Sequence, residues 1–396
     1  MDKNNWTYKK LGEVATLVAD GDWIESKDQS EQGIRLIQTG NIGNGFFKSK
    51  DDKPHFISEE TMSRLNCTEI FQGDCLVSRL PDPVGRACLI PNLGCRMITA
   101  VDCSIIRFDN DYLPQFFVDY SQSAKYRNSI DNNTTGTTRK RISRKNLEKI
   151  SIPIPPLAEQ ERIVAELDLL SSIIDKKKAQ LKELDQLAQS IFYTMFGDPI
   201  TNEKAWEVKK LGEIAIVKTG PFGSMLHKED YIENGIPLVN PIHMKDYAVV
   251  PDMSFTISES KATELSNYLL QENDLVFARR GDIGRCAVIN DKQKGFLCGT
   301  GSLFVRFTEP IDSIFIMHII RSHSFTTSLI SVAKGATMLN INSSIVENLD
   351  IPLPPLPLQQ EFASKIEAIE RQKTLIQQSI DEVQTLFDSR MDYWFG

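Results

Sequence analysis

Apolar side chains recur at alternating steps of three and four in two segments, residues 157–196 and 356–395. Such a heptad pattern is typical of a long helix with a coiled-coil seam. The first seam comprises Ile163, Leu167, Leu170, Ile174, Leu181, Leu184, Ala188, Ile191 and Met195. The second comprises Phe362, Ile366, Ile369, Ile376, Ile380, Val383, Phe387 and Trp394. Prolines end the extended segment before the first seam, which predicts a helix beginning at Leu157 or Ala158.

Each of these helices would be roughly 58 Å long at a rise of about 1.5 Å per residue. Because each is preceded by a domain, we expect the two helices to pair antiparallel about a pseudo-two-fold axis, with one domain at each end. Lys177 and Lys373 interrupt the seams near their middles, and Arg390 interrupts the second seam again. Antiparallel pairing would bring the two lysines close together. They either fix the register of the helices or contact a phosphate group or an acidic partner.

The chain is an internal repeat, in which most landmarks return 199 or 200 residues later. The matching pairs are KKLGEVA (9–15) and KKLGEIA (209–215), GDCLVSR (73–79) and NDLVFAR (273–279), GRACLI (85–90) and GRCAVI (284–289), and IPIPPLAEQ (152–160) and IPLPPLPLQ (351–359). Between these landmarks the two copies diverge. The pattern indicates one scaffold used twice, with two different contact surfaces.

Short apolar runs between turn residues predict strands in both copies. These runs are 34–37, 75–78, 86–90 and 103–108, then 236–239, 275–278, 286–289 and 303–307. One helix is predicted after each set, over 113–130 and 311–330. The fold class is therefore α+β, with two mixed α/β domains separated by two long antiparallel coiled-coil helices and no Rossmann-type βαβ alternation. The predicted boundaries are 1–156 and 198–355 for the domains, and 157–197 and 356–396 for the spacer helices.

Composition indicates where the protein is located in the cell and whether its cysteines bind a metal. The sequence has ordinary globular proportions, with 41% hydrophobic and 25% charged residues. It contains no apolar run long enough for a membrane span, and its first residues do not resemble a signal peptide, so we expect a cytoplasmic protein without membrane contact. Its seven cysteines form no CxxC pair, which favours buried thiols over disulfides or a zinc site.

The order of these segments resembles one known family. A domain, IPIPPLAEQERI, a long helix, FGDP, a second domain, IPLPPLPLQQEF and a second helix follow one another over essentially the whole chain. This organisation resembles the specificity subunit of type I restriction-modification systems. KTGPFGSMLHKEDYIENGIPLVN (218–240) also resembles the opening of many target-recognition domains in that family.

The resemblance implies two target-recognition domains, each reading one half of a bipartite, asymmetric site in double-stranded DNA. It implies that the helices dock two methyltransferase subunits, which bind S-adenosylmethionine, and that restriction translocase-nuclease subunits join this complex. No cofactor is expected in this chain. The expected docking residues are Gln160, Arg162, Gln359 and Gln360. The net charge of −8 suits such an assembly, because partners can supply phosphate contacts that an isolated DNA binder must make itself.

The densest positive cluster follows a turn rich in threonine and glycine. Its candidate DNA contacts are Thr137, Thr138, Arg139, Lys140, Arg141 and Arg144. Small residues let the backbone approach a phosphate, and arginine can contact phosphates or guanine edges. The equivalent loop holds Thr337 and Asn340 but lacks the arginines, so we expect the second domain to read DNA differently. The alternative interpretation is a solvated charged face.

Further candidates lie at strand ends beside turns. The arginines are Arg79 and Arg86 around LPDPVG, and Arg279, Arg280 and Arg285 around GDIG. They either enter a DNA groove or form ion pairs with Asp82 or Asp282. The remaining candidates are Gln38, Asn41, Lys218, Ser224, Asn240 and His243. The amides and the imidazole can pair with adenine or guanine edges, although polar surface turns would also account for them.

No catalytic motif is present in the sequence. It lacks a Walker A loop, a DPPY-like or NPPF-like tetrad, HExxH and GxSxG, and its five histidines have no metal-ligand spacing. We therefore predict a non-catalytic specificity subunit. The two rival functions are a stand-alone DNA methyltransferase with degenerate motifs, which would bind S-adenosylmethionine by itself, and a structural coiled-coil scaffold, which would not bind DNA.

Overall fold

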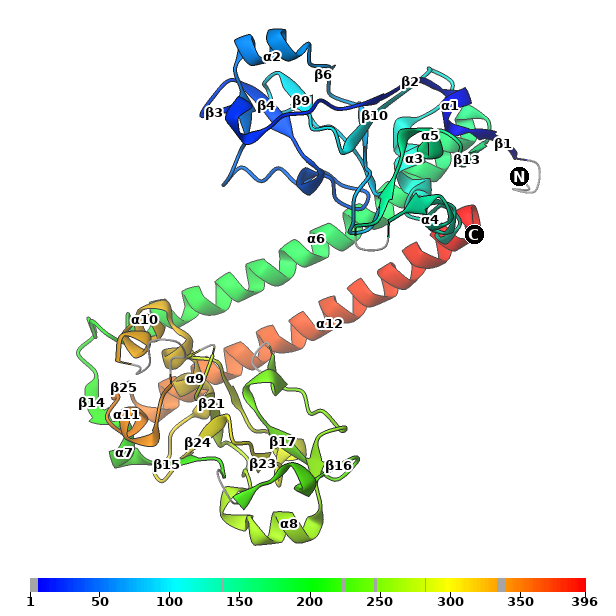
Figure 1. The fold of residues 1–396 in the computed structure, drawn as a ribbon. Coiled ribbons are helices and arrows are strands. Elements are labelled where there is room, and N and C mark those ends of the chain that lie inside the picture. The colour runs from blue at the N-terminus through cyan, green and yellow to red at the C-terminus, as the bar shows by residue number, and fades with distance from the viewer. Residues whose placement is uncertain (1–5, 137–138, 222–224, 246–247, 282, 333–339) are drawn as a thin grey trace. The chain divides into compact units, whose positions relative to one another are not determined.

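The structure is a computed structural model that describes residues 6–136, 139–221, 225–245, 248–281, 283–332 and 340–396. The chain folds into two compact units. Unit 1 comprises Met1–Lys178 and Gln378–Gly396, and unit 2 comprises Ala179–Gln377. Two 40-residue helices, α6 (Leu157–Phe196) and α12 (Leu356–Phe395), each contribute one half to each unit (Figure 1). The predicted start of the first long helix is thus confirmed.

Unit 1 contains two sheets and two short ladders. The four-stranded sheet has the order β2 (Ala15–Asp20), β10 (Cys103–Phe108), β7 (Cys75–Ser78) and β8 (Ala87–Leu89). The five-stranded sheet has the order β3 (Gln29–Ser30), β5 (Phe56–Ile57), β4 (Ile34–Ile37), β9 (Met97–Thr99) and β6 (Glu69–Ile70). The ladders join β1 (Thr7–Lys10) to β13 (Ser151–Ile154), and β11 (Thr134–Thr135) to β12 (Arg141–Ile142). Its shorter helices are α1 (Leu11–Val14), α2 (Glu59–Leu65), α3 (Pro114–Tyr120), α4 (Ala124–Asn132) and α5 (Arg144–Leu147).

The four-stranded sheet of unit 1 is buried on both faces. Cys75 and Val77 belong to the core cluster that includes residues of α3, α4 and the two long helices. Leu76, between them, belongs to the cluster shared with the five-stranded sheet. Because successive strand residues point to opposite faces, a middle layer needs an unbroken apolar run, and this is the run from which the strand was predicted.

Unit 2 repeats this plan. Its first sheet has the order β15 (Ala215–Thr219), β24 (Ser302–Phe307), β21 (Leu275–Ala278) and β22 (Cys286–Val288). Its second sheet has the order β16 (Tyr231–Ile232), β20 (Thr256–Ile257), β17 (Ile236–Val239) and β23 (Leu297–Cys298). The ladders pair β14 (Glu207–Lys210) with β25 (Asp350–Leu353), and β18 (Met244–Lys245) with β19 (Ala248–Val249). The shorter helices are α7 (Leu211–Ile214), α8 (Glu259–Glu264), α9 (Ser313–Arg321), α10 (His323–Val332) and α11 (Ser343–Glu347).

All eight predicted strands are present, but the prediction of one helix after each set is wrong. Two helices follow instead, α3 and α4 in unit 1 and α9 and α10 in unit 2. Serines mark both breaks. The hydroxyl of Ser123 caps α4 by accepting from the Tyr126 amide (3.2 Å), and the Ser322 hydroxyl donates to the Ile319 carbonyl (2.7 Å). Serine competes in this way with the helical hydrogen bonds of the backbone, so it favours a helix end.

The long helices run antiparallel within each unit. In unit 1 the Arg162 guanidinium of α6 lies 4.7 Å from the ring centroid of Trp394, and Glu166, one turn later, pairs with Arg390, one turn earlier. In unit 2 Asp185 of α6 pairs with Lys373 of α12, and Phe196 packs on Phe362 with ring centroids 5.3 Å apart. In both units, residues of increasing number on α6 contact residues of decreasing number on α12.

One of the two seam lysines, Lys373, forms ion pairs within unit 2. Lys373 donates to Asp185 across the helix pair (2.8 Å) and to Glu370 on its own helix (3.0 Å). The opposite charge of Asp185 favours this pairing, and a polar seam residue specifies the register of a helix pair. This favours register control for Lys373.

The cysteine prediction is partly confirmed. Five thiols are buried, namely Cys75, Cys88, Cys103, Cys286 and Cys298, and burial raises their pKa values. Cys67 is half-buried and Cys95 is exposed, so neither is a full core residue. Cys95 lies in the polar loop between β8 and β9, where no sheet covers it. Within the described ranges, no helix is both long and apolar enough to cross a membrane.

Candidate nucleic-acid interface

The same short 3-10 turn follows strand β4 in unit 1 and β17 in unit 2, and it carries four of the predicted contacts. In unit 1 the side chain of Asn41 closes the turn from inside. Its Oδ1 accepts from the Gln38 amide (2.9 Å), and its Nδ2 donates to the Lys48 carbonyl (2.9 Å). Asn41 is buried, so its amide is occupied by the protein itself. Gln38 is half-buried and lines a surface pocket with Lys50 and His55, where it can meet a ligand.

The turn in unit 2 uses different residues for the same purpose. His243 is buried, and its Nδ1 lies 2.7 Å from the Leu238 carbonyl, to which it donates in the Nδ1-protonated tautomer. The Asn240 Oδ1 accepts from the Gly301 amide (3.1 Å). Ile242, between these two residues, has 70% of its surface exposed. An apolar side chain in this position can contact a thymine methyl group. Sequence reasoning missed Ile242, although an isoleucine between polar turn residues is a usable signal.

Arg86 in unit 1 and Arg285 in unit 2 each donate a hydrogen bond to a backbone carbonyl of these turns. Arg86 is buried, and its guanidinium donates to the carbonyls of Ile42 (2.7 Å), Thr39 (2.8 Å), Leu80 (2.8 Å) and Pro83 (3.0 Å). Burial lowers its pKa. These bonds use the hydrogens that a DNA contact would need, so Arg86 acts as a brace for the turn.

Arg79 and Arg279 are also directed inward. Arg79 is buried, and its two terminal nitrogens donate to Asp20 (3.2 Å) and to the Val101 carbonyl (2.6 Å). Its ion-pair partner is therefore Asp20 and not Asp82, the partner considered from the sequence. The Arg279 Nε donates to the Ile341 carbonyl (3.3 Å). Burial lowers the pKa values of both arginines. Asp282, the other acidic residue considered, lies outside the described residues.

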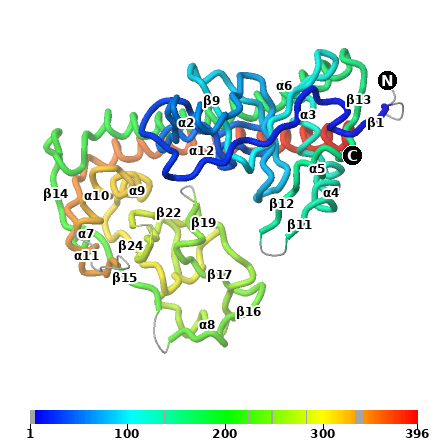
Figure 2. The backbone as a smooth tube through the Cα atoms, turned by 45° about the horizontal axis from the view of Figure 1, so that its top comes forward, coloured from blue at the N-terminus to red at the C-terminus, as the bar shows by residue number. Residues whose placement is uncertain are grey.

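The basic cluster of unit 1 lies on the β11–β12 hairpin and on α5. Figure 2 shows the hairpin projecting beside α4 and α5. Arg139 and Lys140 are exposed. Arg141 pairs with Asp102 (2.9 Å), and Arg144 pairs with Glu148 (3.3 Å), yet both side chains remain nearly half exposed. Such exposed ion pairs are weak, so a phosphate can replace the carboxylate.

The other candidates lie in several places. Lys218 of β15 stacks over the Tyr268 ring, with its Nζ 4.8 Å from the centroid. Arg280 is exposed and forms an isolated backbone bridge with Asn340. The Asn340 Oδ1 is buried and accepts no hydrogen bond from the described atoms. The remaining predicted contacts, Thr137, Thr138, Ser224 and Thr337, lie outside the described residues.

Two of the expected docking residues face inward. The Gln160 Oε1 accepts from the Leu113 amide (2.8 Å), and its Nε2 donates to the Pro155 carbonyl (2.9 Å). Gln359, its repeat counterpart, makes the same bonds with the Asp312 amide (3.1 Å) and the Pro354 carbonyl (2.8 Å). Both side chains are buried. Their amides therefore attach each long helix to its own domain and do not face a partner.

The other two docking candidates remain accessible. Arg162 is exposed, donates to Glu159 (3.0 Å) and lies over the Trp394 ring. Gln360 is exposed beside the buried Gln359. Arg162 and Gln360 therefore stay as predictions for partner contact.

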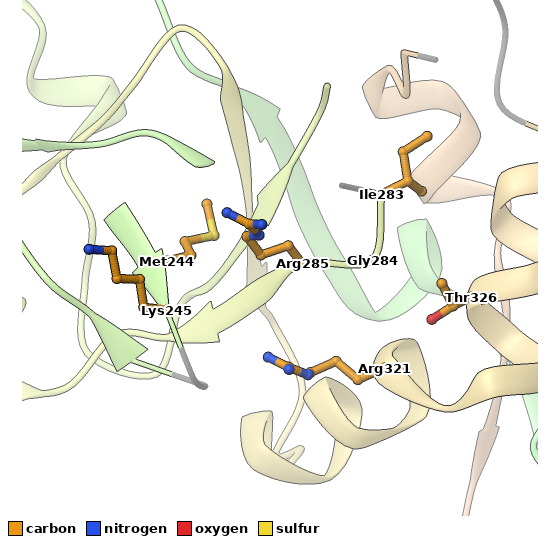
Figure 3. Close-up of a pocket in the computed structure, with 7 residues that line it drawn as sticks. All are labelled: Met244, Lys245, Ile283, Gly284, Arg285, Arg321 and Thr326. Atoms are coloured by element: carbon orange, nitrogen blue, oxygen red, sulfur yellow. The ribbon is translucent and has the colours of Figure 1, made fainter. Parts of the chain in front are cut away.

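Unit 2 also contains a cationic pocket that sequence reasoning missed. It has a volume of about 430 Å³ and lies beside the turn that carries Ile242. Its described lining residues are Met244, Lys245, Ile283, Gly284, Arg285, Arg321 and Thr326 (Figure 3). Lys245 and Arg321 are far apart in sequence and stand in no motif, so only the fold brings them together. Among the described residues, no group of three His, Cys, Asp or Glu side chains is placed to hold a metal ion.

Comparison with known proteins gives a consistent result over nearly the whole chain. The sequence matches the family model described as the type I restriction modification DNA specificity domain twice, over residues 3–186 and 203–385. The MjaIX specificity subunit of Methanocaldococcus jannaschii is 25% identical, over 92% of this chain and 87% of that protein. The EcoKI specificity subunit of Escherichia coli K12 is 23% identical, over 92% of this chain and 82% of that protein.

Solved structures share the fold. A chain from a study of the complex assembly and conformational transition of the type I R-M system aligns with a TM-score of 0.60 and 18% identity, covering 98% of this chain and 97% of that one. The type I restriction-modification S subunit from M. genitalium aligns with a TM-score of 0.58 and 13% identity, covering 99% of this chain and 96% of that one. At such identities the likeness concerns the fold alone.

Proposed function

Because this chain belongs to the type I restriction-modification DNA specificity family, we propose that unit 1 and unit 2 each read one half of a bipartite, asymmetric DNA target. The chain is the specificity component of such a system and is not itself an enzyme; methylation and cleavage belong to other subunits. The family match, present once in each repeat, assigns DNA specificity to both halves of the chain.

The observation that carries the proposal is a shared scaffold with unlike surfaces. Both units have the same 3-10 turn, but Gly40 of unit 1 stands where unit 2 exposes Ile242. Unit 1 carries exposed Arg139 and Lys140, and the corresponding loop of unit 2 has no such arginines in the sequence. Two different surfaces on one scaffold suit two different half-sites, since base-edge contacts determine sequence choice.

The long helices supply the second element of the proposal. Each is continuous over 40 residues, or about 60 Å at a rise of 1.5 Å per residue. A continuous helix pair is stiff, so we propose that it sets the spacing between the two half-sites. DNA half-sites on one face are separated by about one helical turn, roughly 34–36 Å, or a multiple of it.

The partners follow from the same assignment. We propose that two methyltransferase subunits dock on the helical regions and bring S-adenosylmethionine, and that translocase-nuclease subunits complete the restriction complex. The net charge of −8 supports DNA contacts by the partner subunits as well, because this chain needs further basic residues from them to neutralise the phosphates. We also propose a cytoplasmic location for the working complex, because its partners are DNA and these subunits.

Adenine-methylome sequencing of cells that express this chain with its methyltransferase subunit tests the function. The expected result is a split motif, one half of which changes when residues 1–156 are replaced by those of another specificity subunit. A matched exchange of residues 198–355 should change only the other half. A motif that survives both exchanges would contradict readout by this chain.

Two control measurements address the rival functions. S-adenosylmethionine is titrated into the purified chain without partners, where saturable binding would favour a stand-alone methyltransferase. Random duplexes are then titrated with and without methyltransferase subunits at several salt concentrations. Absence of DNA binding in both states would favour a structural scaffold.

A further inference from the structure

The cationic pocket of unit 2 gathers positive side chains from three separate elements. Lys245 ends β18, Arg285 precedes β22, and Arg321 ends α9. In Figure 3 the side chains of Arg285 and Arg321 both extend toward the side on which Lys245 lies, and Thr326 lies on the other side. A concave site with three cations and a volume of about 430 Å³ can accept a phosphate group with part of its sugar.

The corresponding place in unit 1 has different residues. Gln122 stands where unit 2 has Arg321, 199 residues later. The loop at Asn44 and Gly45 packs against this place: the Gly45 amide donates to the Ala87 carbonyl (3.0 Å), and Asn44 accepts from Arg127. A Cβ atom at Gly45 would meet the Gln122 side chain at 2.5 Å. The combination of lining residues that includes Arg321 therefore belongs to unit 2 and is not shared by unit 1.

The floor of the pocket belongs to the same turn that presents Ile242. Arg285 donates to the Pro241 carbonyl (3.2 Å), the residue before Ile242, and Met244 follows that turn. A Cβ atom at Gly284 would approach Thr326 of α10 to 3.1 Å, so the turn before β22 and the helix α10 are in close contact. A group bound in the pocket is thus held at a fixed position relative to the exposed side chain of Ile242.

We propose that this pocket binds one backbone phosphate of the DNA half-site read by unit 2, through Lys245, Arg285 and Arg321. The inference rests on the proposed function, since it names a contact within that DNA interface. Phosphate contacts fix the register of a protein on the duplex, while base edges supply the sequence choice. The pocket anchors unit 2 so that the turn carrying Ile242 meets the same base pair in every complex.

Arg321→Gln is the first test, because it places the unit 1 residue in unit 2. Binding of the complex with methyltransferase subunits to its target duplex is measured over a range of salt concentrations. Loss of one phosphate contact should reduce the slope of log K against log salt by about 0.9. Affinity for target and random duplexes should fall by the same factor, and the methylated motif should stay unchanged. Lys292→Gln, at an exposed lysine of unit 2 outside the pocket lining, is the matched control and should keep the slope.

A neutral methylphosphonate placed at single positions of the duplex locates the contact. One position in the unit 2 half-site should weaken binding of the wild-type complex and leave the Arg321→Gln complex almost unaffected. Lys245→Gln, on an exposed side chain, should give the same pattern and guards against misfolding of the arginine variant. Inorganic phosphate is titrated as a competitor, and competition that Arg321→Gln abolishes without a change of slope would assign the pocket to a free anion instead.

Three results would overturn the inference or its premise, and they are distinguishable. An unchanged slope in both variants, with target-specific binding by the wild type, would reject the phosphate site alone. A changed methylated motif in Arg321→Gln would make the pocket a base-reading element. A wild-type complex without target preference would reject the proposed function itself.

Discussion

Glu166 of α6 accepts two hydrogen bonds at its Oε2 from α12, from the Arg390 Nη2 (3.1 Å) and the Trp394 Nε1 (3.2 Å). Arg390 lies 224 residues after Glu166 in the sequence and interrupts the apolar seam of its helix. The seam is polar here because a carboxylate of the other helix faces it. The contact links the start of one long helix to the end of the other within unit 1.

Glu166→Gln is therefore expected to lower the unfolding free energy of the chain by about 1 kcal/mol. A hydrogen bond to a charged carboxylate is stronger than one to a neutral amide, and solvent screening of the partly exposed pair keeps the difference small. The Arg390 hydrogen bond holds the Glu166 pKa below its usual value. Its stabilisation is therefore complete above the unfolded pKa of about 4.3 and is lost as pH falls through the lower folded pKa. Denaturant unfolding should show a larger difference between the variant and the wild type at pH 7 than at pH 3. Glu161→Gln, exposed on the same helix, should be neutral at both.

Gln160→Ala and Gln359→Ala are expected to destabilise their units by similar amounts, about 1–3 kcal/mol each. Each change removes the acceptor of a partly buried backbone amide, of Leu113 or Asp312, and the donor to a buried proline carbonyl. Thermal unfolding measures the effect. Gln360→Ala, one residue further on an exposed face, should leave the transition in place. If the side-chain amides of Gln160 and Gln359 contacted a partner instead, both variants would unfold like the wild type and would lose only the binding of the methyltransferase subunit.

The positions of these two glutamines could be predicted from the sequence, but their structural role could not. The prolines and the heptads located both long helices, because helix starts and apolar seams are local patterns. Gln160 and Gln359 were also found, but as partner contacts, since a sequence does not reveal which side of a helix start faces its own domain. Arg86 poses the same problem. Its position beside a turn suits a DNA groove, and only the fold shows four carbonyls around its guanidinium.

Arg86→Gln and Arg139→Gln should therefore separate structure from binding. The first is expected to lower stability by about 2 kcal/mol or more, because several buried carbonyls lose charged donors. The second should leave the unfolding transition unchanged and reduce the salt dependence of DNA binding, by about 0.9 in slope for one phosphate contact. Unfolding and DNA titration of both variants provide the comparison. Normal stability in Arg86→Gln would show that the brace contributes little.

The last pair of residues shows how the two repeats diverge inside the scaffold. Asp119 of α3 and His318 of α9 are equivalent positions, 199 residues apart, and both are buried. Burial raises the pKa of Asp119 to about 8 and lowers that of His318 to about 3. Both folded side chains are therefore neutral at pH 7, one by holding its proton and the other by lacking one. The corresponding unfolded pKa values are about 3.9 and 6.5.

The two residues should give opposite pH dependences of stability. Between about pH 4 and 8 unfolded Asp119 releases its proton while the folded residue keeps it, so unfolding becomes easier as pH rises, by up to about 1.4 kcal/mol per pH unit. Between about pH 6.5 and 3 unfolded His318 gains a proton that the folded residue refuses, so unfolding becomes easier as pH falls. Asp119→Asn, which keeps the acceptor for the Gln115 amide, should stabilise more at pH 8 than at pH 5. His318→Gln should stabilise more at pH 5 than at pH 8. Calorimetric unfolding at pH 5 and pH 8 measures the change in unfolding free energy of each variant. If both variants gave the same pH dependence, the opposite pKa shifts of these two equivalent positions would be contradicted.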